Sequence, residues 1–108
     1  MNSDKRSLAV RPQARLDLVE LATYISRDSA DAAWRLLDAA EETFEFLAMN
    51  SQAGAIYSTK NAQLVGLRVF QIRDFPNHLS FYLERELSIE IVRVLHGARN
   101  VDAVLNLE

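Results

Sequence analysis

The sequence contains no cysteine and only two histidines among its 108 residues. The absence of cysteine excludes disulfide bonds and thiolate chemistry, because both need the cysteine sulfur. A chain with two histidines and no cysteine also offers little for a structural zinc site. We therefore expect neither a metal nor any other cofactor.

Long hydrophobic segments are also absent. No apolar run approaches the roughly 20 residues of a membrane span, and the polar start at residues 1–6 lacks a following apolar segment of signal-peptide type. We therefore expect a cytoplasmic protein that does not contact a membrane.

An excess of basic residues is missing as well, since the formal net charge is −3. Proteins that bind nucleic acid through its phosphates usually carry a basic excess, so we expect no direct nucleic-acid contact. The charge is unevenly distributed: residues 12–50 hold eight acids and three arginines, whereas residues 64–100 hold five arginines and four acids. Any anion-binding surface should therefore belong to the second segment.

The length of 108 residues allows one domain with one modest core. Apolar residues make up 49% of the chain and charged residues 25%, a balance typical of a folded protein rather than a disordered one. We expect a single domain over residues 1–108.

Two helices are predicted in the first half of the chain. A short edge strand at residues 7–11 stops at Pro12, which suits the first position of a helix. A helix should span about residues 13–27, and Asp28 and Ser29 can cap a second one that follows directly. Such a short link predicts an antiparallel helical hairpin. The core stripes at helical spacing are Ala14, Leu18, Leu21, Ala22 and Ile25, and then Ala33, Leu36, Leu37, Ala40, Phe44 and Leu47.

Four residues of this hairpin lie off its core stripes. Leu16, Val19 and Thr23 form a second stripe roughly opposite the core of the first helix. Trp34 projects toward the acidic side of the second helix, where its large apolar ring is unfavourable in water unless something covers it. Packing against the loop around Tyr57 is the structural alternative to a partner on this surface.

Three strands and a short helix are predicted in the second half. Residues 50–63 should form a loop, and strands should cover about residues 68–73, 78–84 and 87–96, with turns at 74–77 and 85–86. The last strand is apolar at both parities, as in a central strand that is covered on both faces. Asn100 can cap a short C-terminal helix. The fold class is therefore α+β, a small antiparallel sheet packed against an N-terminal helical hairpin.

Several short strings give the chain a family resemblance. They are Val10 to Ala14, Gly66-Leu67-Arg68, the Phe81-Tyr82 pair and the closing string Arg93-Val94-Leu95-His96-Gly97-Ala98-Arg99. Together they resemble the ParE branch of the RelE/ParE toxin superfamily. The resemblance implies the toxin of a type II toxin–antitoxin pair, which binds a ParD-like antitoxin in a hetero-oligomer. It also implies a non-enzymatic inhibitor of DNA gyrase that blocks replication.

The RelE branch of the same superfamily, whose members cut mRNA in the ribosome, is the first alternative. That reaction needs cations to stabilise the phosphate and a residue that transfers protons, commonly a tyrosine or histidine near the C-terminus. The predicted sheet supplies Arg68, Arg73, Arg93 and Arg99, but the tail after Arg99 holds only Val, Asp, Ala, Leu, Asn and Glu. A second alternative is a degenerate toxin that binds only its antitoxin.

The candidate target-binding residues are Arg68, Arg93, His96 and Arg99, and the candidate antitoxin-binding residues are Leu16, Val19, Thr23 and Trp34. A strand arginine inside an apolar run usually needs a local partner, so an internal salt bridge of Arg93 to Glu90 or to a hairpin acid is favoured over a target contact. His96 has a structural alternative as a hydrogen-bonding cap of the sheet. Gly97 is expected to let the backbone leave the last strand.

Overall fold

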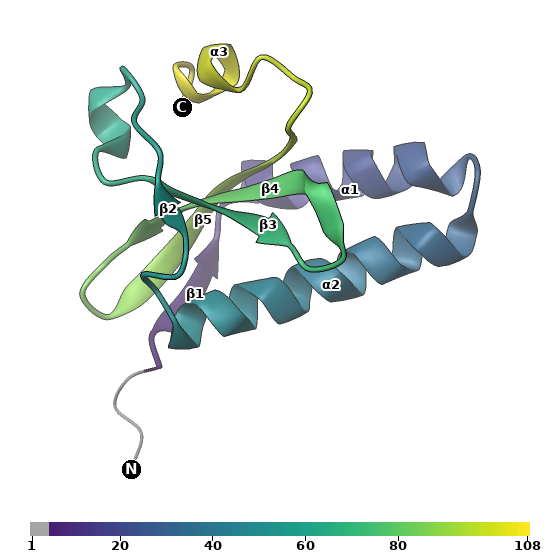
Figure 1. Ribbon diagram of the computed structural model, residues 1–108, viewed down its shortest axis with the longest axis horizontal. Helices are drawn as coiled ribbons and strands as arrows, with labels where there is room; N and C mark the ends of the chain where they lie inside the picture. The colour runs from purple at the N-terminus through teal and green to yellow at the C-terminus, as the bar shows by residue number, and fades with distance from the viewer. Residues whose placement is uncertain (1–4) are drawn as a thin grey trace.

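The computed structural model describes residues 5–108. Residues 1–4, on which the expectation about a signal peptide partly rests, lie outside the described part. In chain order the elements are β1 (Ser7–Val10), α1 (Pro12–Ser26), α2 (Ala30–Met49), β2 (Ala55–Ile56), the 3₁₀ turn η1 (Ala62–Leu64), β3 (Arg68–Ile72), β4 (Phe75–Glu84), β5 (Ser88–His96) and α3 (Val101–Leu105) (Figure 1).

The strands form one five-stranded sheet in the order β1-β5-β4-β3-β2. The predicted antiparallel meander is confirmed for β3, β4 and β5, and β2 joins β3 in the same antiparallel sense. β1 instead pairs parallel to β5, from Ser7↔Ser88 to Val10↔Ile91, so the sheet is mixed. A parallel pair needs a long crossover connection, and the hairpin and three other strands provide it.

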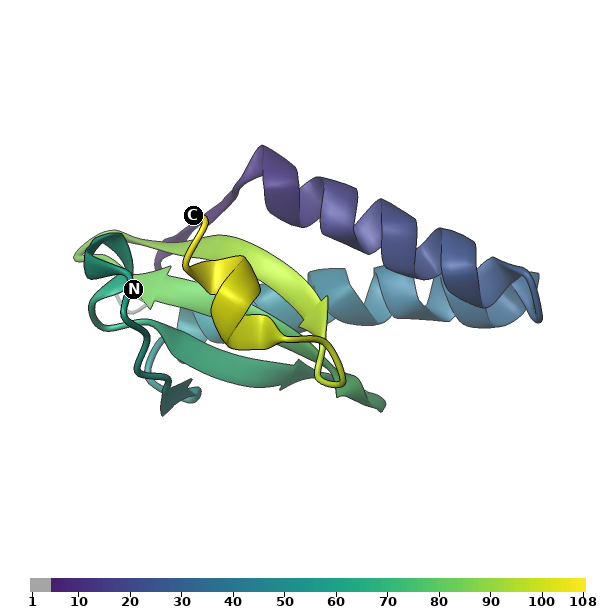
Figure 2. The same cartoon turned by 90° about the horizontal axis from the view of Figure 1, so that it is seen from above.

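The sheet is covered on both faces (Figures 1 and 2). α1 and α2 pack on one face over a cluster that includes Leu36, Phe44, Tyr82 and Ile91. On the other face, α3 and η1 cover a smaller cluster around Phe81. β5 is buried from both sides, as its apolar pattern predicted.

The predicted α+β class and helical hairpin are confirmed. Pro12 occupies the start of α1, and the Ser29 hydroxyl accepts a hydrogen bond of 3.1 Å from the Ala32 N–H at the start of α2. The tip of the hairpin extends past the sheet (Figures 1 and 2), so Leu21, Ile25 and Leu37 are only half-buried. No helix between residues 5 and 108 has both the length and the apolar character to cross a membrane.

Two local predictions were wrong. The expected loop over residues 50–63 contains β2 and η1, which are too short to give a periodic signal. β4 begins at Phe75, so the turn after β3 is only Arg73-Asp74, and Asp74 adopts the left-handed φ of 67° that aspartate tolerates better than most residues. The chain leaves β5 at Gly97 as expected, but without a positive φ, whereas Gly66 has a φ of 85°.

Candidate functional site

Arg93 lies in a buried ion-pair network between β5, α1 and the C-terminal segment. Its Nε and Nη2 donate to the two carboxylate oxygens of Asp17 at 2.7 and 2.8 Å, and its Nη1 donates to Glu108 at 2.8 Å. Asp17 also accepts from the Val94 N–H at 3.0 Å. The hydrogen bonds that Arg93 donates to Asp17 raise the pKa of Arg93 above its ordinary value, although burial acts in the opposite direction.

The internal partner of Arg93 is therefore a hairpin acid and not Glu90. Only 9% of Arg93 is exposed. Glu90 pairs instead with Arg11 and Arg85 at 2.9 and 2.8 Å. Asp17 could have been found from the helical pattern, because this acid lies between Ala14 and Leu18 on the core face of α1.

Arg68 holds the segment before β2 against the start of β3. Its Nη1 donates to the carbonyl oxygens of Gly54 at 2.7 Å and Gln52 at 3.3 Å. The Tyr82 hydroxyl closes the same corner, since it accepts from the Gly54 N–H and donates to the Ser51 carbonyl. Burial raises the pKa of Tyr82, so this hydroxyl keeps its proton.

His96 and His78 are neighbours on β5 and β4. They are register partners, and their ring centroids lie 5.1 Å apart. Nδ1 of His96 accepts a hydrogen bond of 3.0 Å from the Ala98 N–H, so the predicted capping contact of this histidine is present. Nδ1 of His78 is buried and has no partner among the described residues. Burial, with a smaller effect from His96, lowers the pKa of His78.

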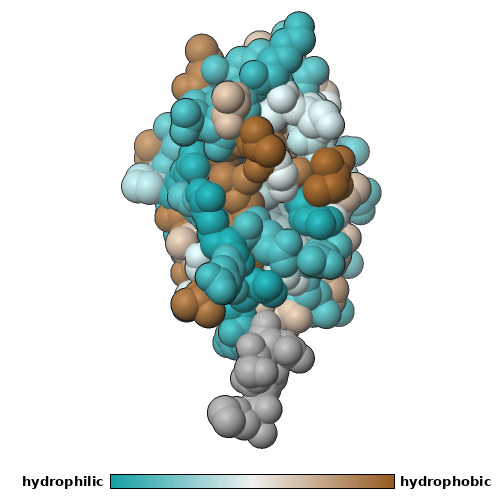
Figure 3. Space-filling view, turned by 90° about the vertical axis from the view of Figure 1, so that its left-hand side faces the viewer, coloured by the Kyte–Doolittle hydropathy of each residue, from teal (hydrophilic) through white to brown (hydrophobic). Residues whose placement is uncertain are grey.

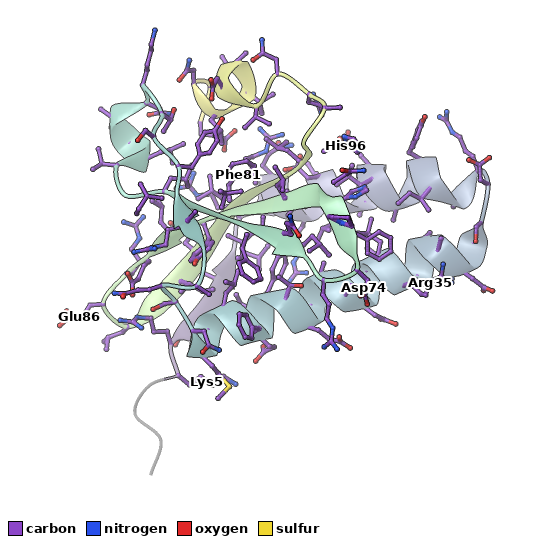
Figure 4. All side chains as sticks on the ribbon, viewed as in Figure 1. Lys5, Arg35, Asp74, Phe81, Glu86 and His96 are labelled. Atoms are coloured by element: carbon purple, nitrogen blue, oxygen red, sulfur yellow. The ribbon has the colours of Figure 1, made fainter. Side chains whose placement is uncertain are left out.

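Arg99 lies on the exposed bend that follows β5, and its backbone N–H donates to the His96 carbonyl at 3.1 Å. These two residues thus belong to one surface at one end of the sheet. Figure 4 shows His96 at this end and Glu86, in the β4–β5 turn, at the other.

The structure does not bring all four predicted target-binding residues together. Tyr82, the register partner of Arg68, lies four positions after His78, the partner of His96. At about 3.3 Å per residue, Arg68 is roughly 13 Å from the His96 end. Arg93 is buried between the two ends. Of the four, only His96 and Arg99 are neighbours at one end of the sheet, since Arg68 is half-buried at the other end.

The outer face of the hairpin carries the four residues predicted to bind an antitoxin. Leu16, Val19 and Trp34 are 55%, 58% and 67% exposed, and Thr23 is exposed as well. An ion pair between Arg15 and Glu41 joins the two helices along this face. The exposure of Trp34 excludes the alternative that it packs on the loop around Tyr57, whose ring instead contacts Phe81.

A second surface lies beside β3 and was not predicted from the sequence. It is an open cavity of about 970 Å³ between α2 and the outer edge of β3, and we call it the edge slot. Phe46 of α2 stacks on Phe70 of β3 within it, with ring centroids 5.6 Å apart. The signal in the sequence was Phe46 itself, because an aromatic residue two positions after Phe44 cannot share its core face. The principal lining residues are Thr43, Phe46, Tyr57, Val69, Phe70, Gln71, Ile72 and Leu79.

At the end of the molecule that carries β2 and η1, hydrophobic side chains are separated by hydrophilic ones, so no broad apolar face appears there (Figure 3). Within residues 5–108, there is no group of at least three histidine or acidic side chains that could hold a metal ion.

Comparison with known proteins identifies the family. A sequence profile described as the ParE toxin of the type II toxin–antitoxin system parDE matches residues 8–101. The chain belongs to this toxin family. The toxin also resembles a solved structure described as a chromosomal ParDE toxin–antitoxin system from P. aeruginosa, with 18% sequence identity and a TM-score of 0.68. The match covers 87% of the toxin and 98% of that chain, and it shows a shared fold. No curated protein matches the sequence.

Proposed function

We propose that this ParE-family toxin inhibits DNA gyrase by binding it, that it blocks replication without being an enzyme, and that a ParD-like antitoxin neutralises it. The observation that carries the proposal is the family match over residues 8–101. The family-like string from Arg93 to Arg99 lies inside this match.

Two of the four arginines considered for mRNA cleavage are bonded inside the protein, which favours a binding mechanism, whereas Arg73 and Arg99 are exposed. Cleavage needs cations that are free to contact the scissile phosphate. Arg93 is neutralised by Asp17 and Glu108, and Arg68 is bonded to two backbone carbonyls. We propose that His96 and Arg99 contact the target directly, whereas Arg68 and Arg93 position the strands that carry them.

We place the antitoxin on the outer face of the hairpin. Leu16, Val19, Thr23 and Trp34 offer apolar surface to an amphipathic segment, and buried aromatic anchors commonly supply much of the binding energy. A segment that orders on binding loses conformational entropy, so its anchors must offset that loss. Trp34 is the candidate anchor.

Expression of the toxin without its antitoxin tests the proposed function. Incorporation of labelled thymidine and of labelled methionine should be followed side by side after induction. We expect thymidine incorporation to fall first, with filamentation and a DNA-damage response, because trapped gyrase breaks DNA while translation continues. An immediate loss of methionine incorporation with cut mRNA would favour the endonuclease, and normal growth would favour a degenerate toxin.

A further inference from the structure

We propose that the edge slot receives an extended segment of the antitoxin as an added strand beside β3. This inference rests on the neutralisation proposed above and gives it a second contact. β2 pairs with β3 only through Ala55↔Val69 and Ile56↔Arg68. Within residues 5–108, no strand follows β2 along the outer edge of β3, and residues 70–72 line the open cavity instead.

The backbone of Gln71 faces this open edge. The Tyr57 N–H donates to the Leu67 carbonyl at 2.8 Å, so Leu67 points its backbone groups toward β2. Backbone groups alternate in direction along a strand, so Val69 and Gln71 point the same way. Gln71 is exposed. The open stretch ends at Arg73, whose N–H donates to the Thr43 hydroxyl at 3.0 Å.

The slot has apolar walls on both faces of the sheet. On the helical face, Phe46 stacks on Phe70 at an interplanar angle of 24° and remains 46% exposed. On the opposite face, Tyr57 and Leu79 line the cavity. Successive side chains of a strand point to opposite faces, so walls on both faces suit a strand better than a helix. Main-chain hydrogen bonds to an open edge, with side chains in flanking pockets, are the physical basis of strand addition.

The charge of the surrounding surface favours the antitoxin over a second copy of the toxin. Glu42 lines the slot and is mostly exposed, and Arg73 is 3.8 Å from it. The segment from residue 12 to residue 50, which includes α2, has five more acids than arginines. Two copies paired edge to edge would bring these acidic surfaces together, which is unfavourable. The fitting partner is therefore an extended antitoxin segment with apolar side chains on both faces.

The binding test uses the full-length toxin and the full-length antitoxin encoded next to the toxin gene. Phe46→Asp places a charge in the wall of the slot, and Gln71→Pro removes the outward N–H at an edge position where proline is tolerated. Met49→Asp is the matched control, because Met49 is also on α2, is 52% exposed and does not line the slot. We expect Phe46→Asp to weaken binding by about 30-fold or more and Gln71→Pro by about 10-fold. The control should stay within about twofold of the wild type.

Hydrogen exchange of the wild-type complex gives a second readout that does not depend on how the variants fold. The Gln71 amide should exchange about 100-fold more slowly in the complex than in the free toxin, because an added strand accepts its proton. If the antitoxin binds tightly, but exchange at Gln71 is unchanged and Phe46→Asp has no effect, the added strand is wrong. The proposal that the antitoxin neutralises the toxin would then still stand. Failure of the wild-type toxin to bind the antitoxin would overturn both proposals.

Two further outcomes would assign the slot to another occupant. A concentration-dependent dimer of the free toxin that Phe46→Asp abolishes, seen by sedimentation, would assign it to a second copy. Loss of growth inhibition in Phe46→Asp with antitoxin affinity unchanged and the fold intact would assign it to the toxin's target. Either result would overturn the proposal.

Discussion

Arg93 and Asp17 are 76 residues apart in the chain and meet in a two-pronged buried ion pair, with N···O distances of 2.7 and 2.8 Å. The pair joins the central strand β5 to the first helix of the hairpin. Both groups have lost most of their contact with water, so each depends on the other for compensation of its charge.

Replacing Arg93 by alanine should therefore destabilise the fold by about 3–5 kcal/mol, the range for removing one partner of a buried pair. Asp17 and Glu108 would be left without their cation. Arg99→Ala, on the exposed bend after β5, should change the free energy of unfolding by less than about 0.5 kcal/mol. Urea unfolding of both variants measures the difference, and a loss in Arg93→Ala as small as that expected for Arg99→Ala would mean that the ion pair adds nothing.

Close packing leaves no room for a side chain at Gly54, whereas there is room for one at Gly97. A Cβ at Gly54 would lie 2.8 Å from the Tyr82 ring, from its hydroxyl and from the Val69 carbonyl oxygen. The nearest atoms to a Cβ at Gly97 are 3.5 and 3.6 Å away, which is ordinary contact. Gly54→Ala should cost about 1–3 kcal/mol, as for overpacking, and Gly97→Ala should be nearly neutral. Thermal unfolding compares the two, and a larger loss at Gly97 would contradict the observed backbone.

Stability should fall as the pH drops below about 6.5, because of His78. Burial and His96 lower the pKa of His78 in the folded state. The unfolded chain then takes up the proton first, so acidification through the ordinary histidine pKa of about 6.5 favours unfolding. Above that pH His78 is neutral in both the folded and the unfolded state, so it no longer destabilises the fold.

Urea unfolding at about pH 7.5 and about pH 5.5 tests this dependence, with His78→Gln as the control. Glu90 does not interfere in this window. The hydrogen bond from Arg11 lowers the pKa of Glu90 below 4.5, so the stability it contributes is present above pH 4.5 and is lost only in stronger acid. We expect the variant to lose less stability than the wild type between the two conditions. An identical loss in both proteins would show that His78 is not responsible.

On the hairpin face, Leu16→Asp or Trp34→Ala should weaken antitoxin binding by about 2 kcal/mol or more, the range of interface hot spots. Toxicity of the free protein should remain largely intact, because neither residue is among those proposed to contact the target. Leu87→Asp is the matched control, since Leu87 is an exposed apolar residue, 78% accessible, in the β4–β5 turn. Calorimetric titration of the antitoxin into the three variants measures their affinities. Wild-type affinity in both hairpin variants would assign the interface to the edge slot instead of the hairpin.

Much of this fold could be predicted, because periodic patterns are long in the helices and in β5. The stripe from Ala33 to Leu47 and the apolar run from Ile89 to Leu95 each identified an element and its burial. β2 could not be predicted, since two residues carry no period and their pairing with Arg68 and Val69 is set by the tertiary fold. Strand direction was equally hidden, so the parallel β1·β5 pair was missed.

The candidate sites could be predicted only in part, because they also depend on tertiary contacts. A local pattern indicated that Arg93 needs an acid, but only the fold shows that Asp17 supplies it together with Glu108. The exposed stripe of Leu16 and Val19 followed directly from helical geometry. The edge slot depends on the end of β2 and on the position of α2 against β3, and neither can be read from residue types.

The most direct test of the proposed function is a DNA cleavage assay with purified gyrase. Toxin, gyrase, ATP and supercoiled plasmid should be incubated together and treated with detergent and protease, and linear DNA should then be measured. The proposal predicts that linear DNA accumulates with the toxin, that an equimolar amount of antitoxin prevents this, and that Arg99→Ala reduces it without loss of stability. Unchanged gyrase activity, together with cutting of mRNA by the same toxin in a purified translation system, would contradict it.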